Sequence, residues 1–230
     1  MPVNTPRLAL NLSHLPPMTL APFIDGLDGV DEWYLPVSDG DAAPLHGTGP
    51  GLVAAVAAAS PVPCHVHLMN RRPGRHVALF ADTGCKTLTV QLESCPHPHR
   101  VLGHIRDAGM SPGIALAPGT PLTRLDYLLA LADRVLLLGT EPGRDGVAPG
   151  SLFERVKLLD ENIRYRELAV EIGVMGGLDA AGLGKAARLG AKWAVTGPEV
   201  FAGLNGDGVA EYAAALERFK QAMTLAVQTA

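Results

Sequence analysis

The stretch Ala169-Val170-Glu171-Ile172-Gly173-Val174-Met175-Gly176-Gly177-Leu178 decides the fold of this chain. A mostly apolar run, typical of a strand, stops at a pair of glycines, and a run typical of a helix follows. Such a turn suits an anion, because glycines let a ligand approach the backbone and free N–H groups at a helix start point toward it. We therefore predict a phosphate cradle at Gly176 and Gly177. Met175 lies at the last strand position, where a barrel enzyme would present a reactive side chain. Its thioether cannot transfer protons, so we predict that the reaction differs from one that uses an acid or base at this position.

The same alternation of strand-like and helix-like runs repeats along the chain. Strands are predicted at residues 8–12, 32–37, 64–68, 87–92, 113–117, 134–138, 168–174 and 193–196, and helices at 51–59, 99–108, 123–131, 152–164, 180–189 and 209–227. Apolar strands that alternate with helices are typical of a parallel sheet buried on both faces. Eight such units predict a (β/α)8 TIM barrel that spans residues 1–230 as a single domain. A doubly wound open sheet is the alternative, but its early Gly-x-Gly-x-x-Gly turn is missing.

Composition narrows the class of protein. The chain has 230 residues, of which 47% are hydrophobic, and a net charge of −4, so no nucleic-acid partner is expected. No uninterrupted apolar run reaches the ~18 residues of a membrane span, and the first residues lack the features of a signal peptide. Cys64, Cys85 and Cys95 fit a reducing compartment. The sequence therefore predicts a cytoplasmic protein with a small-molecule ligand.

In a TIM barrel the ligand lies at the C-terminal ends of the strands, so the residues there are the candidates for binding and catalysis. The last two strand ends are where phosphate commonly binds in this fold, and Gly176, Gly177, Thr196 and Gly197 suit that purpose. The remaining candidates at the strand ends are Ser13, His67, Met69, Glu93, Glu141, Gly143 and Arg144.

Five motifs, read in order, resemble those of the ribulose-phosphate 3-epimerase family. They are CHVHLM at 64–69, the segment 109–121 that contains GIALAPGTP, TEPG at 140–143, VMGG at 174–177 and the segment 190–197 that ends in VTG. The resemblance covers nearly the whole chain. It implies a TIM barrel of the ribulose-phosphate-binding type, a phosphorylated sugar as the ligand, and a homo-oligomer.

The resemblance also implies a catalytic set that this chain lacks in large part. The family uses two aspartates as paired acid and base, and a divalent metal held by those aspartates and two histidines. Here Pro36 and Met175 stand at the aspartate positions and Tyr34 at one histidine position, which leaves His67. One imidazole does not hold a metal alone, so His67 is a doubtful metal ligand and the cofactor stays open.

Three residues are candidates for an altered catalysis: His67, Glu93 and Glu141. Each has a plainer interpretation: His67 as a hydrogen-bonded histidine at a strand end, Glu93 as a carboxylate that orients a neighbour, and Glu141 as part of a solvated turn. Arg144, in the same turn, would neutralise a phosphate if the loop closes over the ligand. A new metal site that combines His67 with Cys95, His97 and His99 is a further alternative to a simple loop at 95–99.

Three functions follow from this sequence. The first is an enzyme that epimerises or isomerises a phosphorylated sugar by an altered mechanism. The second is a non-catalytic barrel that binds a sugar phosphate, because both catalytic aspartates are missing. The third is a lyase or synthase on the same frame, since one barrel supports many reactions.

Overall fold

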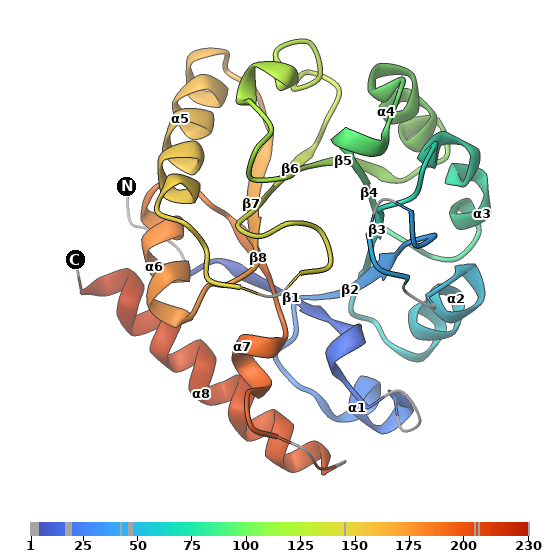
Figure 1. Ribbon diagram of the computed structural model, residues 1–230. Coiled ribbons are helices and arrows are strands. Elements are labelled where there is room, and N and C mark those ends of the chain that lie inside the picture. Colours follow the sequence, from blue (N-terminus) through green and yellow to red (C-terminus); the bar gives the residue numbers. More distant parts are fainter. Residues whose placement is uncertain are drawn as a thin grey trace.

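The computed structural model describes residues 5–16, 20–41, 43–45, 48–144, 146–204, 206 and 208–229. In these residues eight parallel strands follow one another around a closed barrel, and the last pairs with the first (Figure 1). The TIM barrel predicted from the sequence is therefore confirmed. The strands are β1 (Arg7–Asn11), β2 (Glu32–Val37), β3 (Cys64–Leu68), β4 (Thr87–Gln91), β5 (Ser111–Leu116), β6 (Arg134–Leu138), β7 (Glu171–Met175) and β8 (Trp193–Thr196).

Helices surround the barrel and cover the outer faces of the strands (Figure 1). The apolar residues that face outward from the strands and inward from the helices form the main core. Among the described residues, none of the helices combines the length and the apolar character that a membrane crossing requires. The helices are α1 (Leu20–Gly26), α2 (Pro50–Ala59), α3 (Val77–Ala81), α4 (Pro98–Asp107), α5 (Ser151–Tyr165), α6 (Ala180–Arg188), α7 (Pro198–Phe201) and α8 (Val209–Gln228).

One predicted helix was wrong, and one predicted strand is present but begins later than expected. The helix expected at 123–131 is a short 3-10 helix, η5 (Leu122–Leu125), followed by turns. Bonds such as those from the Leu128 N–H to the Leu125 carbonyl, 2.8 Å, tighten this segment and bury its leucines without a full α-helix. The strand expected at 168–174 begins only at Glu171, because residues 167–168 cap α5: the Leu168 N–H donates to the Ile163 carbonyl.

Helix α8 lies across α6 and reaches α7 and α1 (Figure 1). The approach to α6 is close: a Cβ added at Gly184 would lie 2.7 Å from the Cβ of Ala226. This contact ties the last helix to the segment that follows β7. Helix α8 also packs against the short helix α7, which lies at the C-terminal end of β8 beside the mouth of the barrel.

The middle of the barrel is filled by large side chains. Trp193 and Tyr34 are fully buried there and pack with smaller apolar residues, including Ala115 and Leu136. The indole of Trp193 occupies the space beside Gly173, so that a Cβ at Gly173 would overlap the ring. A filled middle layer leaves space for a ligand only at the mouth of the barrel.

We predict that Gly173→Ala destabilises the barrel, because the added methyl group has to displace the indole of Trp193. The free energy of unfolding should fall by about 3 kcal/mol in urea denaturation. Gly103→Ala is the control: Gly103 lies inside α4 with open space at its Cβ position, so alanine should raise the stability by about 0.5–1 kcal/mol. Equal effects of the two substitutions would contradict this account of the barrel interior.

Candidate functional site

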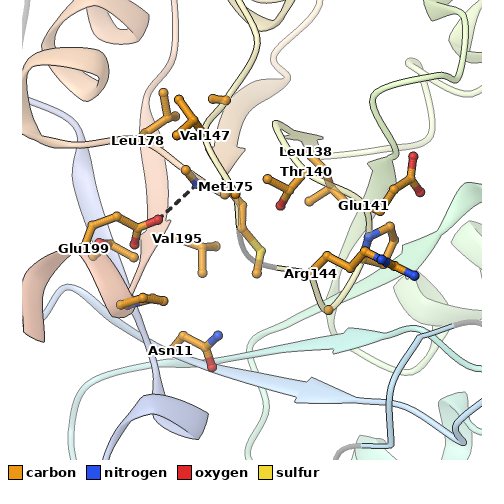
Figure 2. A pocket seen from close by; sticks show the side chains of 18 of the residues that line it. Asn11, Leu138, Thr140, Glu141, Arg144, Val147, Met175, Leu178, Val195 and Glu199 are labelled. Carbon is orange, nitrogen blue, oxygen red and sulfur yellow. Dashed lines mark hydrogen bonds between the residues drawn. The ribbon is translucent and has the colours of Figure 1, made fainter. Parts of the chain in front are cut away.

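A cavity of about 710 Å³ opens at the C-terminal end of the strands, where the sequence places the ligand. Its walls come from the segments that follow β1, β3, β6, β7 and β8. Figure 2 shows Met175 near the middle, with Glu199 on one side and Glu141 and Arg144 on the other. The site residues expected from the sequence that line this cavity are Ser13, His67, Met69, Glu141, Gly143, Arg144, Gly176, Gly177 and Thr196.

Glu93 and Gly197 lie outside the cavity lining. The carboxylate of Glu93 accepts hydrogen bonds from the Gln91 amide, the Thr120 hydroxyl and, at 3.0 Å, the Ala117 N–H. Two of these three donors, Ala117 and Thr120, belong to the loop after β5, so Glu93 holds that loop, as expected of an orienting residue. At Gly197 the position that a Cβ would occupy faces His14, whose Cδ2 would lie 2.6 Å from an added Cβ.

His67 is positioned by Tyr34 from the neighbouring strand. The two residues are fully buried, and the Tyr34 hydroxyl lies 2.5 Å from Nδ1 of His67. Burial raises the pKa of Tyr34 far above its usual value, so the phenol stays protonated beside Nδ1 of His67. A neutral imidazole that accepts at Nδ1 carries its own proton on Nε2. In that tautomer His67 offers an N–H donor to the cavity that it lines.

Comparisons with known proteins agree with this architecture. A model of the ribulose-phosphate 3 epimerase family matches residues 18–201. The chain is 34% identical over 175 residues to ribulose-phosphate 3-epimerase from Rhodobacter capsulatus, covering 76% of each chain. It is 32% identical over 202 residues to the chloroplastic ribulose-5-phosphate-3-epimerase of Arabidopsis thaliana, covering 84% of this chain and 68% of that protein. The chain belongs to the ribulose-phosphate 3-epimerase family.

Solved structures show the same fold in more distant proteins. The tryptophan synthase α-subunit from Pyrococcus furiosus superposes with a TM-score of 0.68 and 17% identity, and the match covers 96% of this chain and 97% of the other. At this identity the likeness supports the barrel and carries no information about the ligand.

The residues at the family's metal positions do not fit a divalent metal. Pro36 and Met175 line the cavity together with His67, and Pro36 is the register partner of His67 between β2 and β3. Proline has no side-chain ligand atom, and a thioether is a poor ligand for a hard cation. The fourth position holds Tyr34, whose neutral hydroxyl is directed at His67. No cluster of three or more histidine, cysteine or acidic residues in the described part of the chain is arranged to hold a metal ion.

The residues of the alternative metal site, in the loop 95–99, do not fit a metal either. Cys95 is buried, and burial raises the pKa of its thiol, which disfavours the thiolate that a metal needs. His97 and His99 are exposed on the way into α4 and lie outside the cavity lining. The simpler interpretation, a loop that leads into a helix, agrees with this placement.

The sequence reasoning missed Glu199, which lies in the first turn of α7. Its Oε1 accepts a hydrogen bond from the Gly177 N–H at 3.0 Å, the dashed line in Figure 2. Its position two residues after Gly197 was a signal, because the residues that follow the last strand face the predicted phosphate cradle. His14 and Asp179 also line the cavity without having been singled out.

A polar network lies beneath the site, toward the N-terminal end of the barrel. Glu32 is buried, and its carboxylate lies 2.6 Å from Nη1 of Arg134 and 3.5 Å from Nδ1 of His65. Nε2 of His65 is 2.7 Å from the Thr89 hydroxyl. Burial alone would raise the pKa of Glu32, but its contacts with His65 and Arg134 outweigh this effect and lower the pKa from 4.5 to about 2.

We predict that Glu32 makes the stability of the barrel depend on acid pH. A carboxylate with a lowered pKa stabilises the folded state above its unfolded pKa, and that contribution is lost as the pH falls from about 4.5 toward 2. The difference in unfolding free energy between the wild type and Glu32→Gln should therefore shrink by about 3 kcal/mol between pH 5 and pH 2. Urea denaturation over this range measures it.

The control is Glu154→Gln, which removes an exposed carboxylate from the first turn of α5. Its difference from the wild type should change by less than about 0.5 kcal/mol over the same range. A constant difference for Glu32→Gln would contradict the assignment of Glu32 as a stabilising buried carboxylate.

Proposed function

We propose that this protein binds a sugar-type small molecule in the cavity at the mouth of the barrel, without the metal-assisted epimerisation implied for the family. The floor of the cavity carries this proposal. It keeps the imidazole of His67, which we assign as an N–H donor, while Pro36 and Met175 stand where proton transfer and metal binding need aspartates. The floor therefore suits recognition of a ligand oxygen better than removal of a proton from carbon.

Other polar groups of the cavity support a hydroxylated ligand. The Asn11 Oδ1 accepts from the N–H of Ser13 at 3.1 Å and from its hydroxyl at 2.9 Å, which leaves the amide hydrogens of Asn11 for a ligand oxygen. The Thr196 hydroxyl is buried, with a residue exposure of 3%, and has no hydrogen-bond partner among the described residues. A buried hydroxyl without a protein partner points to a ligand or to water.

The apolar part of the cavity suits the carbon face of a sugar. Leu138, Met175 and Val195 lie next to one another on the last three strands and contribute apolar surface to the lining. The relatives are named for ribulose phosphate, so family membership supports a sugar as the ligand class. Ribulose 5-phosphate and unphosphorylated ribulose are therefore the first ligands to test. A homo-oligomer and a cytoplasmic location stay predictions.

Calorimetric titration of both sugars, with His67→Ala and His104→Ala, tests the binding proposal. Loss of the His67 donor should weaken binding by about tenfold, the value of a hydrogen bond to a neutral partner. His104, exposed on α4, is the matched control, and its replacement should leave the affinity unchanged. A metal-dependent exchange of the carbon-bound hydrogen at C3 in deuterated water would contradict the proposal.

A second function, an isomerase that uses one base, is favoured by the presence of His67 and Glu141 in the same cavity. A neutral imidazole with a proton on Nε2 can polarise a ligand carbonyl, and Glu141 lines the same cavity as a carboxylate that could move the proton. This enzyme would exchange the hydrogen next to the carbonyl without a metal. The exchange should be lost in Glu141→Gln while binding persists; absence of exchange in the wild type leaves the binding function.

A further inference from the structure

The place where this fold commonly binds phosphate is occupied by the chain itself. In TIM barrels that place lies between the loops after β7 and β8 and the start of a short extra helix. Here these parts are Gly176 and Gly177, Gly197, and the helix α7. The carboxylate of Glu199 sits on the Gly177 N–H at 3.0 Å, so that a negative charge already takes the donor that a phosphate would need (Figure 2).

The start of α7 has little left to offer an anion. Pro198, the first residue of the helix, has no N–H. The N–H groups of Val200 and Phe201 both donate to the Gly197 carbonyl at 3.1 Å. Two of the first amide N–H groups of α7 therefore already have a partner within the chain. The acidic side chain of Glu199 lies in the same turn.

At Gly176 and Gly177, the position that a Cβ would occupy is close to other parts of the protein. A Cβ at Gly176 would lie 2.5 Å from Oγ1 of Thr140, and one at Gly177 would lie 2.5 Å from the Ala148 nitrogen. The Ala148 N–H also donates to the Gly177 carbonyl at 3.1 Å. The loop after β6 therefore covers the glycine pair, and the space that glycine provides is used for packing against that loop.

The charges of the residues around the cavity also disfavour a bound phosphate. The described residues around the cavity include three carboxylates, Glu141, Asp179 and Glu199, and one guanidinium, that of Arg144. Asp179 is committed to α6, where it accepts from the Gly182 N–H at 2.8 Å. A phosphate dianion placed at the cradle would meet Glu199 at short range, and like charges that close are strongly unfavourable.

We infer that the ligand of this cavity is an unphosphorylated sugar or polyol, whose end beside β7 and β8 is a hydroxyl that donates to Glu199. One Glu199 oxygen bonds to Gly177, and the carboxylate has further acceptor capacity for a ligand hydroxyl. The buried Thr196 hydroxyl, which lines the same end and has no partner among the described residues, supplies a second polar contact. The inference rests on the proposed function in that the same cavity holds the ligand.

Titration of inorganic phosphate, followed by 31P line broadening and calorimetry, tests the cradle directly. The wild type should show no saturable binding. Glu199→Ala frees the Gly177 N–H and removes the charge, so its phosphate affinity should rise by about tenfold or more. Glu199→Gln removes the charge but keeps an acceptor for Gly177, so its gain should be smaller. Glu154→Gln, which removes an exposed carboxylate outside the cavity, should behave as the wild type.

The sugar arm compares ribulose with ribulose 5-phosphate on the same four proteins. The wild type should bind ribulose at least as tightly as its phosphate, and Glu199→Ala should reverse that preference. Saturable phosphate binding by the wild type overturns the inference, and so does a failure of Glu199→Ala to gain phosphate affinity with its circular dichroism unchanged. If neither sugar binds, the proposed function fails, while the phosphate titration still decides whether Glu199 closes the cradle.

Discussion

The packing of Trp193 against the backbone of Gly173 is the constraint on which the rest of the barrel depends. The indole fills the middle of the barrel and stands where any side chain at position 173 would be. Because the two residues are register partners on β7 and β8, the contact fixes the spacing of these strands. Met175 and Thr196 at their ends are therefore held in place. A closed interior also confines the ligand to the mouth, where the loops decide what is bound.

The residues that stand at the metal-ligand positions of the family are consistent with one another. A metal centre needs several charged or polar ligands, and the loss of one would leave the others as buried groups without partners. Here Pro36 and Met175 contribute apolar surface, and Tyr34 gives its hydroxyl to His67. The Tyr34 hydroxyl and Nδ1 of His67 are paired with each other. The imidazole of His67 is thus held by a neighbour that is itself too deeply buried to ionise.

Much of the fold and part of the site could be predicted from the sequence. Apolar strand runs define the barrel, and since the ends of parallel strands converge, residues such as His67, Gly177 and Thr196 could be placed at one cavity. Contacts between side chains of different elements were harder to foresee. Tyr34 is the register partner of His65, yet its hydroxyl reaches His67 diagonally across the strands. Glu199 reaches Gly177 because the segments that follow β7 and β8 meet at the mouth of the barrel, and its place just after Gly197 was the sequence signal for this contact.

The glycine pair shows why a motif can outlast the ligand with which it is associated. Gly176 and Gly177 have φ values of +93° and +68°, a region that other residues rarely adopt. The backbone therefore requires glycine at this turn whether or not an anion is bound. Packing adds a second demand, since the loop around Ala148 lies directly against Gly177. These glycines report the shape of the turn, whereas phosphate binding is governed by the groups that surround them: a proline without an N–H at the start of α7, and a carboxylate on the amide of Gly177.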